Sequence, residues 1–456
     1  MRIILYLIAG LISSTAFAPF EFWISAFIGL GLWFFLLDKS SPTARFMGSY
    51  LYGLGLLLPA QHWTGIYVGN FPWIVLCLVQ SIFFIIPAFF FANGMRFKPY
   101  IFASSYVLVE LLLRTIPFTG FGWSRMSYTQ TQSPFSMLYP IGGVVLVAWV
   151  VAFSVAIRRL SALILVLTLM SLAVVVPSQI TNSGKIKVAL IQGGVNKLGL
   201  DFNSIPREVF FRHLDQTNRL TESVDLIIWP ENAVDIDVNQ NSDIRKLITD
   251  ISVAKRTPIL VGGVTNSPKG LKNQSMFFNP TLSQIYTKRY LTPFGEYLPI
   301  RPISMRLSNY AKQIDDFTAG EQSQTFMFGS VDFQTLICYE LINDRFRDEI
   351  SSNILVIQTN NATFGDTSQL EQELNIAKVR ALETGRNVAY VSTTGVTSLL
   401  SNRGKVLKSV EKFKQTELVG EIALVEGETL AQKYGYLLEP FSLIALLLMR
   451  LRRIRS

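Results

Sequence analysis

Cysteine and histidine are nearly absent from this chain, which contains two of each among 456 residues. The histidines, His62 and His213, are too far apart and too isolated in the sequence to form a set of metal ligands. Two cysteines cannot build a disulfide framework. The chain also lacks a glycine-rich phosphate-binding loop of useful spacing. The sequence therefore predicts no metal, nucleotide or other cofactor.

Charged side chains are also scarce, at 16% of the chain, against about 25% in an average soluble domain. Apolar residues make up 50% of the chain, and the mean hydropathy is +0.34. Long apolar stretches explain both values, because they approach the length of a bilayer span. We predict a transmembrane helical region over residues 1–180 with seven spans. An eighth span would begin the C-terminal segment, residues 434–456, which ends in a basic tail.

Together these stretches predict an α-helical bundle of about eight transmembrane spans. The first stretch also resembles a secretory signal peptide, because it has a basic start, an apolar core and an end of small residues. Cleavage after Ala18 therefore stays an alternative, although it would not move the later segments across the membrane. The apolar stretches cover residues 3–20, 22–37, 46–63, 73–93, 101–113, 139–157, 161–176 and 434–449.

The net charge is +9, but the cations form no basic stripe with interleaved aromatics, so we expect no nucleic-acid partner. The cations gather in alternate short loops and in the tail after the last apolar stretch. Because cations beside membrane spans stay in the cytoplasm, we predict cytoplasmic termini and an external region between the last two spans. The cations concerned are Arg2, Lys39, Arg45, Arg96, Lys98, Arg158, Arg159, Arg450, Arg452, Arg453 and Arg455.

Residues 185–427 have ordinary polarity and alternate between two kinds of pattern. Short runs rich in β-branched and aromatic residues predict strands, and they are IKVALIQ, DLIIWPE, TPILVGG, FQTLICYE, ILVIQTNN and NVAYVSTTG. Two segments with helical periodicity lie among them, IRKLITDISVAKR and LEQELNIAKVRALETGR. Alternation of this kind is typical of α/β layers, so we predict one α/β domain here.

Three residues of this domain together supply acyl-transfer chemistry. Glu231 follows the run IIWP, and α/β folds place their sites at strand ends of this kind. Lys288 lies in YTKRYLTPFGEYLP, where a Pro-Gly turn would present Glu296. Cys338 lies in LICYE. A carboxylate, an amine and a thiol can act as base, charge stabiliser and nucleophile.

Each of these residues also has an ordinary interpretation. Glu231 fits an acid in a loop, Lys288 a solvated charge, and Cys338 a cysteine buried in a strand. However, Cys338 has no cysteine partner in the domain, and a lone thiol outside the cytoplasm indicates reactivity rather than crosslinking. We expect its strand to continue through Glu340, so that alternation places both side chains on one face. A thiol beside a carboxylate and a lysine can be deprotonated for attack.

The order of these motifs adds a family resemblance. WPEN, the YTK lysine and CYE resemble the nitrilase (carbon–nitrogen hydrolase) superfamily, whose members have a four-layer αββα sandwich and a Glu-Lys-Cys triad. The chain as a whole is similar to the apolipoprotein N-acyltransferases. The motifs that support this similarity are YTKRYLTPFGEYLP, ICYE, NNATFG, AKVRALETGR and TTGVTSLL, together with APFEFW, HWTGIYV and FTGFGWSRMSY in the apolar part.

The resemblance implies a reaction and roles for residues. Glu231 would be the general base, Lys288 the oxyanion stabiliser and Cys338 the nucleophile. A fatty acyl chain would pass from a phospholipid, through a Cys338 thioester, to the α-amine of the N-terminal diacylglyceryl-cysteine of an apolipoprotein. The enzyme would lie in the bacterial inner membrane, and nothing in the sequence requires more than a monomer. Glu296, Tyr339 and Glu340 match further supporting or substrate-binding positions of the family.

The chain also departs from the family pattern. Asn361 stands where the family has aspartate, Thr363 where it has tryptophan, and Glu373 where it has histidine. These changes leave the triad intact but affect the acyl pocket. Two other functions stay open: a membrane-tethered amidase or nitrilase that hydrolyses a small amide, and a non-catalytic membrane protein.

Overall fold

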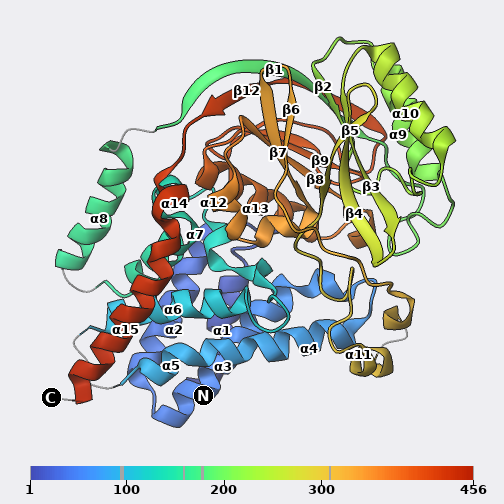
Figure 1. Cartoon of the computed structure of the whole chain (residues 1–456). Coiled ribbons are helices and arrows are strands. Elements are labelled where there is room, and N and C mark those ends of the chain that lie inside the picture. The colour runs from blue at the N-terminus through green and yellow to red at the C-terminus, as the bar shows by residue number, and fades with distance from the viewer. Residues whose placement is uncertain (1, 93–96, 158–159, 176–178, 308–309, 455–456) are drawn as a thin grey trace. The chain divides into compact units, whose positions relative to one another are not determined.

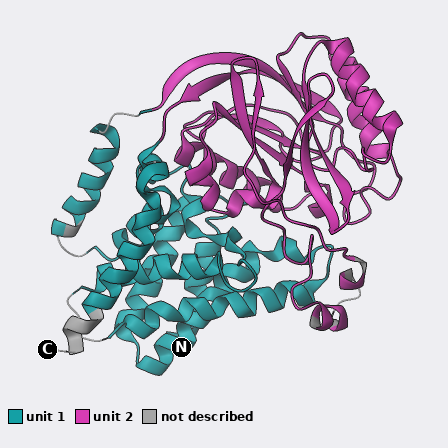
Figure 2. Cartoon of the chain, viewed as in Figure 1, with its two compact units in different colours: residues 1–179, 429–456 teal, residues 180–428 magenta. Residues whose placement is uncertain are grey.

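The computed structural model describes residues 2–92, 97–157, 160–175, 179–307 and 310–454. The chain divides into two compact units (Figure 2). Unit 1 comprises residues 1–179 and 429–456, and unit 2 comprises residues 180–428. Four of the cations that predict the orientation lie outside the described residues, namely Arg96, Arg158, Arg159 and Arg455. Positions 93 and 176, which end two of the apolar stretches, also lie outside them.

Unit 1 is helical, and each of the eight apolar stretches forms a helix over most of its described length. Two helical runs, Asn70–Phe90 and Pro134–Ser154, are long and apolar enough to cross a bilayer among the described residues. The other apolar helices are shorter or less apolar, so the number of spans stays a prediction. The helices are α1 (Arg2–Ser14), α2 (Trp23–Lys39), α3 (Pro42–Ala60), α4 (Asn70–Ser81), α5 (Ile86–Phe90), α6 (Lys98–Leu113), α7 (Tyr139–Ser154), α8 (Leu160–Val175), α14 (Leu430–Tyr434) and α15 (Leu438–Ile454).

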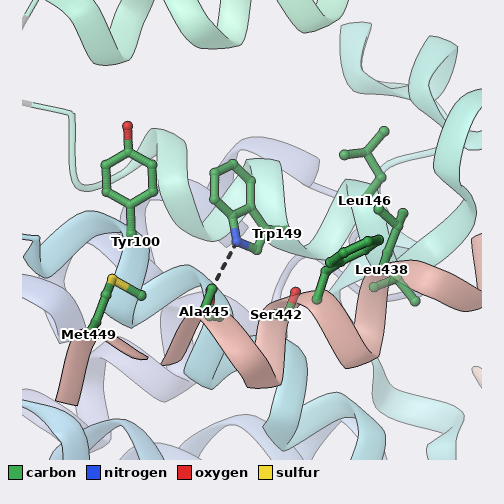
Figure 3. A pocket seen from close by; sticks show the side chains of 10 residues that line it. Tyr100, Leu146, Trp149, Leu438, Ser442, Ala445 and Met449 are labelled. Carbon is green, nitrogen blue, oxygen red and sulfur yellow. Dashed lines mark hydrogen bonds between the residues drawn. The ribbon is translucent and has the colours of Figure 1, made fainter. Parts of the chain in front are cut away.

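Small residues allow the helices of unit 1 to pack closely. A Cβ on Gly10 of α1 would lie 2.2 Å from the Tyr52 carbonyl oxygen of α3, and one on Gly55 of α3 would lie 2.4 Å from the Leu7 carbonyl oxygen. Such backbone contact is typical of apolar helix pairs, which gain from packing rather than from water exclusion. Elsewhere α6, α7 and α15 border an apolar groove of about 300 Å³ around Trp149 (Figure 3).

A charged pair is buried in unit 1. Arg125 Nε donates to Glu110 Oε2 at 3.1 Å, and both side chains are at most 2% exposed. The backbone N–H and the hydroxyl of Ser127 donate to the same carboxylate, at 3.2 and 2.9 Å. Glu110, a charged residue within the fifth apolar stretch, therefore holds the segment after α6 by charge and hydrogen bonds.

Unit 2 contains two six-stranded sheets. The first has the order β12-β1-β2-β3-β4-β5, and the second β11-β10-β9-β8-β7-β6. Their strands are β1 (Thr181–Gln192), β2 (Leu226–Ile228), β3 (Ile259–Ser267), β4 (Gly270–Phe278), β5 (Leu282–Thr287), β6 (Thr325–Phe328), β7 (Val331–Ile337), β8 (Ile354–Thr359), β9 (Val388–Ser392), β10 (Ser398–Leu400), β11 (Val406–Ser409) and β12 (Thr416–Glu426).

The two sheets share one apolar core and carry helices on their other faces. Leu190, Leu226 and Phe277 of the first sheet pack with Phe333 and Val356 of the second. The helices α9 (Glu208–Arg219) and α10 (Ser242–Lys255) cover the first sheet, and α12 (Arg345–Glu349) and α13 (Gln369–Thr384) cover the second (Figure 1). The predicted two-sheet α/β architecture is confirmed.

Parallel pairing determines where the functional side chains gather. β1, β2 and β3 are parallel neighbours, and so are β7, β8 and β9. The carboxyl ends of parallel strands meet at one edge of a sheet, where α/β folds place their sites. Glu231 and Cys338 follow the ends of β2 and β7.

Candidate active site

Glu231 lies just beyond the end of β2 and is buried. The turn that carries it passes close to Gly262 of β3, where a Cβ would lie 2.3 Å from the Pro230 carbonyl oxygen. One carboxylate oxygen accepts from Asn273 Nδ2 at 2.8 Å, and the other from the backbone N–H of Asn360 at 2.9 Å. Both oxygens of Glu231 are therefore held in place.

Lys288 follows the end of β5, and its side chain is 1% exposed. Its Nζ lies 2.9 Å from Glu296 Oε2 and 3.5 Å from Glu231 Oε1. Glu296 is itself fixed by the backbone N–H of Thr292, which donates to its Oε2 at 2.8 Å. The lysine ammonium therefore lies between two carboxylates, one of which belongs to the predicted base, Glu231.

Cys338 begins the short 3-10 helix Cys338–Ile342, directly after β7, and is partly exposed. We expected the strand to continue through Glu340, and this expectation is wrong. The strand ends at Ile337, and Cys338 has φ +50°, a left-handed conformation that residues other than glycine seldom adopt. Strained backbone of this kind occurs at functional sites, where it aims a side chain that a straight strand would direct elsewhere.

The three predicted catalytic residues come together at the edges of both sheets. The Glu231 carboxylate and the Thr359 hydroxyl both influence the pKa of the Cys338 thiol, so both lie near it. Lys288 interacts electrostatically with both Glu231 and Cys338. A thiol, a carboxylate and an ammonium thus form one cluster, although their strands are distant in the sequence.

Glu340 is fully buried and does not share a face with Cys338 as predicted. Its Oε1 accepts from the backbone N–H of Arg289 at 2.7 Å and from the Tyr286 hydroxyl at 2.8 Å, and its Oε2 accepts from the Ile337 N–H at 2.9 Å. Burial raises the pKa of Glu340 to about 7. This carboxylate therefore ties the turn after Lys288 to the turn that carries the thiol. Tyr339 is buried in the same turn.

Asn273 is a site residue that the sequence analysis missed. It lies in β4 and is buried, and its Nδ2 donates to Glu231 and to Glu296, at 2.8 Å each. One amide thereby links two carboxylates of the site. The available signal was the polar run Asn273-Gln274-Ser275 within a strand, since asparagine is depleted in strands.

The electrostatics keep the thiol protonated until a base acts. Burial raises the pKa of the Cys338 thiol well above its ordinary value, and the carboxylates of Glu231 and Glu373 add to the rise. Burial also raises the pKa of Glu231, which makes it a stronger base. Burial opposes the charge of Lys288, but Glu296 and Glu231 outweigh it and hold its pKa above the ordinary value. The site therefore pairs a neutral thiol with a base and a permanent cation.

Two of the departures from the family pattern adjoin the site and contact each other. Asn361 Nδ2 donates to Glu373 Oε2 at 2.6 Å, and both side chains are fully buried. Thr363 lies in the 3-10 helix Asn361–Phe364 and is partly exposed. Within the described residues, no group of three histidine, cysteine or acidic side chains is placed to bind a metal.

Comparison with known proteins gives matches for both units. A family model described as the apolipoprotein N-acyltransferase N-terminal domain matches residues 9–157, and a carbon-nitrogen hydrolase model matches residues 188–432. An apolipoprotein N-acyltransferase of Mycolicibacterium smegmatis is 31% identical over 96% of this chain and 82% of that protein. The protein of that name from Coxiella burnetii is 26% identical over 96% of this chain and 97% of its own length.

Among solved structures, a CN-hydrolase superfamily protein from Xanthomonas campestris is similar with a TM-score of 0.40 and 15% sequence identity. The match covers 52% of this chain and 90% of that protein.

Proposed function

The chain belongs to the apolipoprotein N-acyltransferase family, and we propose that it moves a fatty acyl chain from a phospholipid to the α-amine of an N-terminal diacylglyceryl-cysteine through a thioester on Cys338. The cluster of Cys338, Glu231 and Lys288 carries this proposal. The amidase alternative is not retained, because the relatives that match nearly the whole chain are N-acyltransferases.

In the first half-reaction, Glu231 takes the proton from the nearby Cys338 sulfur. The thiolate attacks the carbonyl carbon of the phospholipid ester, and the Lys288 ammonium stabilises the developing oxyanion. The ester C–O bond then breaks, and the lysophospholipid leaves with the proton that Glu231 holds. An acyl thioester remains on the enzyme.

In the second half-reaction, the α-amine of the apolipoprotein attacks the thioester carbonyl. Glu231 accepts a proton from the amine, an amide bond forms, and the C–S bond breaks. The proton returns to the sulfur, so the thiol is restored. Because the first product leaves before the second substrate reacts, we expect ping-pong kinetics.

We also propose that unit 1 spans the bacterial inner membrane with eight helices, with both termini in the cytoplasm and unit 2, as the catalytic domain, outside. The helical structure of each apolar stretch and the cations in alternate loops support this arrangement. It has a physical advantage, because each methylene taken from lipid into water costs about 0.8 kcal/mol. A site at the membrane surface therefore avoids extracting the acyl chains of either substrate.

The decisive test of the mechanism is the mass of the intact protein after incubation with phospholipid alone. We expect the parent protein to gain the mass of one fatty acyl group, and Cys338→Ala to gain none. Cys77→Ala is the matched control, because Cys77 is fully buried in unit 1 and should leave acylation unchanged. Full acylation of Cys338→Ala would contradict the assigned nucleophile.

A further inference from the structure

Glu373 of α13 is a buried carboxylate that the mechanism above does not use. Its side chain is 0% exposed, and its hydrogen-bond partners are neutral donors that offset the cost of burying the charge. Its Oε1 accepts from Thr359 Oγ1 at 2.8 Å. Its Oε2 accepts from Asn361 Nδ2 at 2.6 Å, Gln369 Nε2 at 3.0 Å and the Tyr390 hydroxyl at 3.1 Å. Both carboxylate oxygens are therefore held in place.

Two of these donors lie on either side of a single residue, Asn360. Thr359 is the last residue of β8, and Asn361 begins the 3-10 helix Asn361–Phe364. Beyond the end of a strand, the ladder of backbone hydrogen bonds no longer fixes the chain. Side-chain bonds must hold it instead, and here both come from Glu373. We call residues 359–361 the clamped turn.

The residue in the middle of the clamped turn contacts the base of the proposed mechanism. The backbone N–H of Asn360 donates to Glu231 Oε2 at 2.9 Å, while Glu231 Oε1 accepts from Asn273 Nδ2 at 2.8 Å. A hydrogen bond donated to a carboxylate favours its ionised form over its protonated form. The direction in which Glu231 faces, and its strength as a base, therefore depend on the position of Asn360.

The two departures from the family pattern that contact each other are complementary in this turn. The Asn361 amide donates to the Glu373 carboxylate, and its Oδ1 accepts from Ser392 Oγ at 2.5 Å. An aspartate at position 361, as in the family pattern, would place two carboxylates in contact. The donor at 361 and the acceptor at 373 therefore depend on each other in this chain.

We propose that Glu373 is a positioning residue that holds the general base, Glu231, through the backbone of the clamped turn. The proposal rests on the proposed function, because only there does Glu231 act as a base. Without the two bonds from Glu373, the Asn360 N–H moves away from the Glu231 carboxylate. Glu231 then binds its proton more tightly, so it is ionised only at higher pH.

The charge of Glu373 and its hydrogen bonds act on Glu231 in opposite directions. The ionisable groups that act on Glu231 are Lys288 and Glu296 from the segment after β5, Cys338 after β7, and Glu373 itself. Removing the negative charge of Glu373 favours ionised Glu231, because like charges disfavour each other. Removing its hydrogen bonds disfavours ionised Glu231. Variants that separate the two effects therefore test the proposal.

The first test is the pH dependence of acyl-enzyme formation, followed by intact mass on the full-length protein in detergent with phospholipid. Glu373→Ala loses both the charge and the clamp. We expect the midpoint of its acidic limb to rise by about one pH unit, so that acylation below that limb is about tenfold slower than in the parent. A midpoint that falls or stays unchanged in Glu373→Ala would overturn the proposal.

Glu373→Gln loses the charge but keeps a carbonyl oxygen for the Asn361 amide and an amide that can donate to the Thr359 oxygen. Its midpoint should stay at the parental value or fall, and a rise equal to that of Glu373→Ala would overturn the proposal. Glu371→Gln is the matched control. It removes a charge from the same helix, where Glu371 pairs with Lys412, and should leave the midpoint unchanged.

The second test is hydrogen exchange at the backbone amide of Asn360, read by mass spectrometry with fragmentation that resolves single residues. We expect exchange to be about tenfold faster in Glu373→Ala than in the parent and unchanged in Glu373→Gln. Asn361→Ala, which removes one of the two bonds, should accelerate exchange less, and it replaces Glu373→Ala if that variant does not fold. Equal exchange in the parent and in the alanine variants would overturn the proposal.

Exchange requires no phospholipid, so the two tests separate this inference from the proposed function. A parent protein that forms no acyl-enzyme would refute the proposed function. Protection of the Asn360 amide that is lost in Glu373→Ala would still show that Glu373 holds the clamped turn.

Discussion

Asn273→Asp would replace the amide that links two carboxylates with a third acid of nearly the same shape. Asn273 Nδ2 donates to Glu231 and to Glu296, both at 2.8 Å, and its own Oδ1 is buried without a partner among the described residues. A protonated aspartic acid has one proton and can serve only one of the two carboxylates. The variant therefore loses at least one hydrogen bond to a charged group, which costs about 1.5–3 kcal/mol.

The pH dependence of this loss is the sharper prediction. Three carboxylates around one ammonium disfavour ionisation, so the pKa of the new acid is raised in the folded protein above its unfolded value of about 3.9. Between these two pKa values the folded state binds the extra proton, so stability falls as the pH rises. The slope is at most about 1.4 kcal/mol per pH unit, or about 2.7 kcal/mol between pH 5 and pH 7.

The assay compares unfolding temperatures of full-length protein in detergent, each variant against the parent at the same pH. We expect the deficit of Asn273→Asp to be larger at pH 7 than at pH 5. Asn273→Ala is the control, because it loses both hydrogen bonds without adding a titratable group, so its deficit should change less with pH than that of Asn273→Asp. An Asn273→Asp deficit that is constant, or that shrinks toward pH 7, would refute the electrostatic reasoning.

Two further predictions concern a close backbone contact in unit 2 and a buried ion pair in unit 1. Gly262→Ala should slow formation of the acyl-enzyme by about 100-fold, since its Cβ would displace the Pro230 carbonyl and with it Glu231. The control is Gly263→Ala, whose Cβ would meet the Met276 methyl at 3.0 Å and which should retain most of the acylation rate in the same mass assay. Equal acylation rates in the two variants would contradict the displacement of Glu231. Glu110→Gln should leave Arg125 buried without its countercharge and destabilise the protein by about 3–5 kcal/mol; an unchanged unfolding temperature would argue against a structural role for the pair.

The sequence predicted the class of unit 2 well, because alternating patterns specify local structure. The β-rich runs that contain Val188, Ile227, Leu260 and Val356 all form strands, and the segments after Asn241 and Ser368 form helices. The strands β4, β5, β6, β10, β11 and β12 were not predicted. Several of these strands are short or carry polar residues on both faces, so they lack the periodicity that identifies a strand.

The continuation of β7 through Glu340 was the clearest error. The apolar run before Cys338 looks like a strand that continues, and local propensity gives no reason for it to end at Ile337. The strand ends there because the Glu340 carboxylate accepts hydrogen bonds from the Ile337 N–H and from the Arg289 N–H. Arg289 lies in the turn after Lys288, which is distant in the sequence. Contacts of this range override local preference, and no pattern within a few residues encodes them.

The sequence by itself determined the chemical groups of this protein: one thiol in a polar domain, an acid after a strand, a lysine before a Pro-Gly turn, and apolar stretches on both sides of that domain. Only the tertiary structure decided which groups meet. The parallel pairing of β7 with β8 brings the end of β8 beside the turn that carries Cys338, and β4 brings Asn273 between two carboxylates. Strand register and burial arise from the whole core rather than from neighbouring residues, and for that reason the partners of Cys338 and Glu231 become visible only in the folded chain.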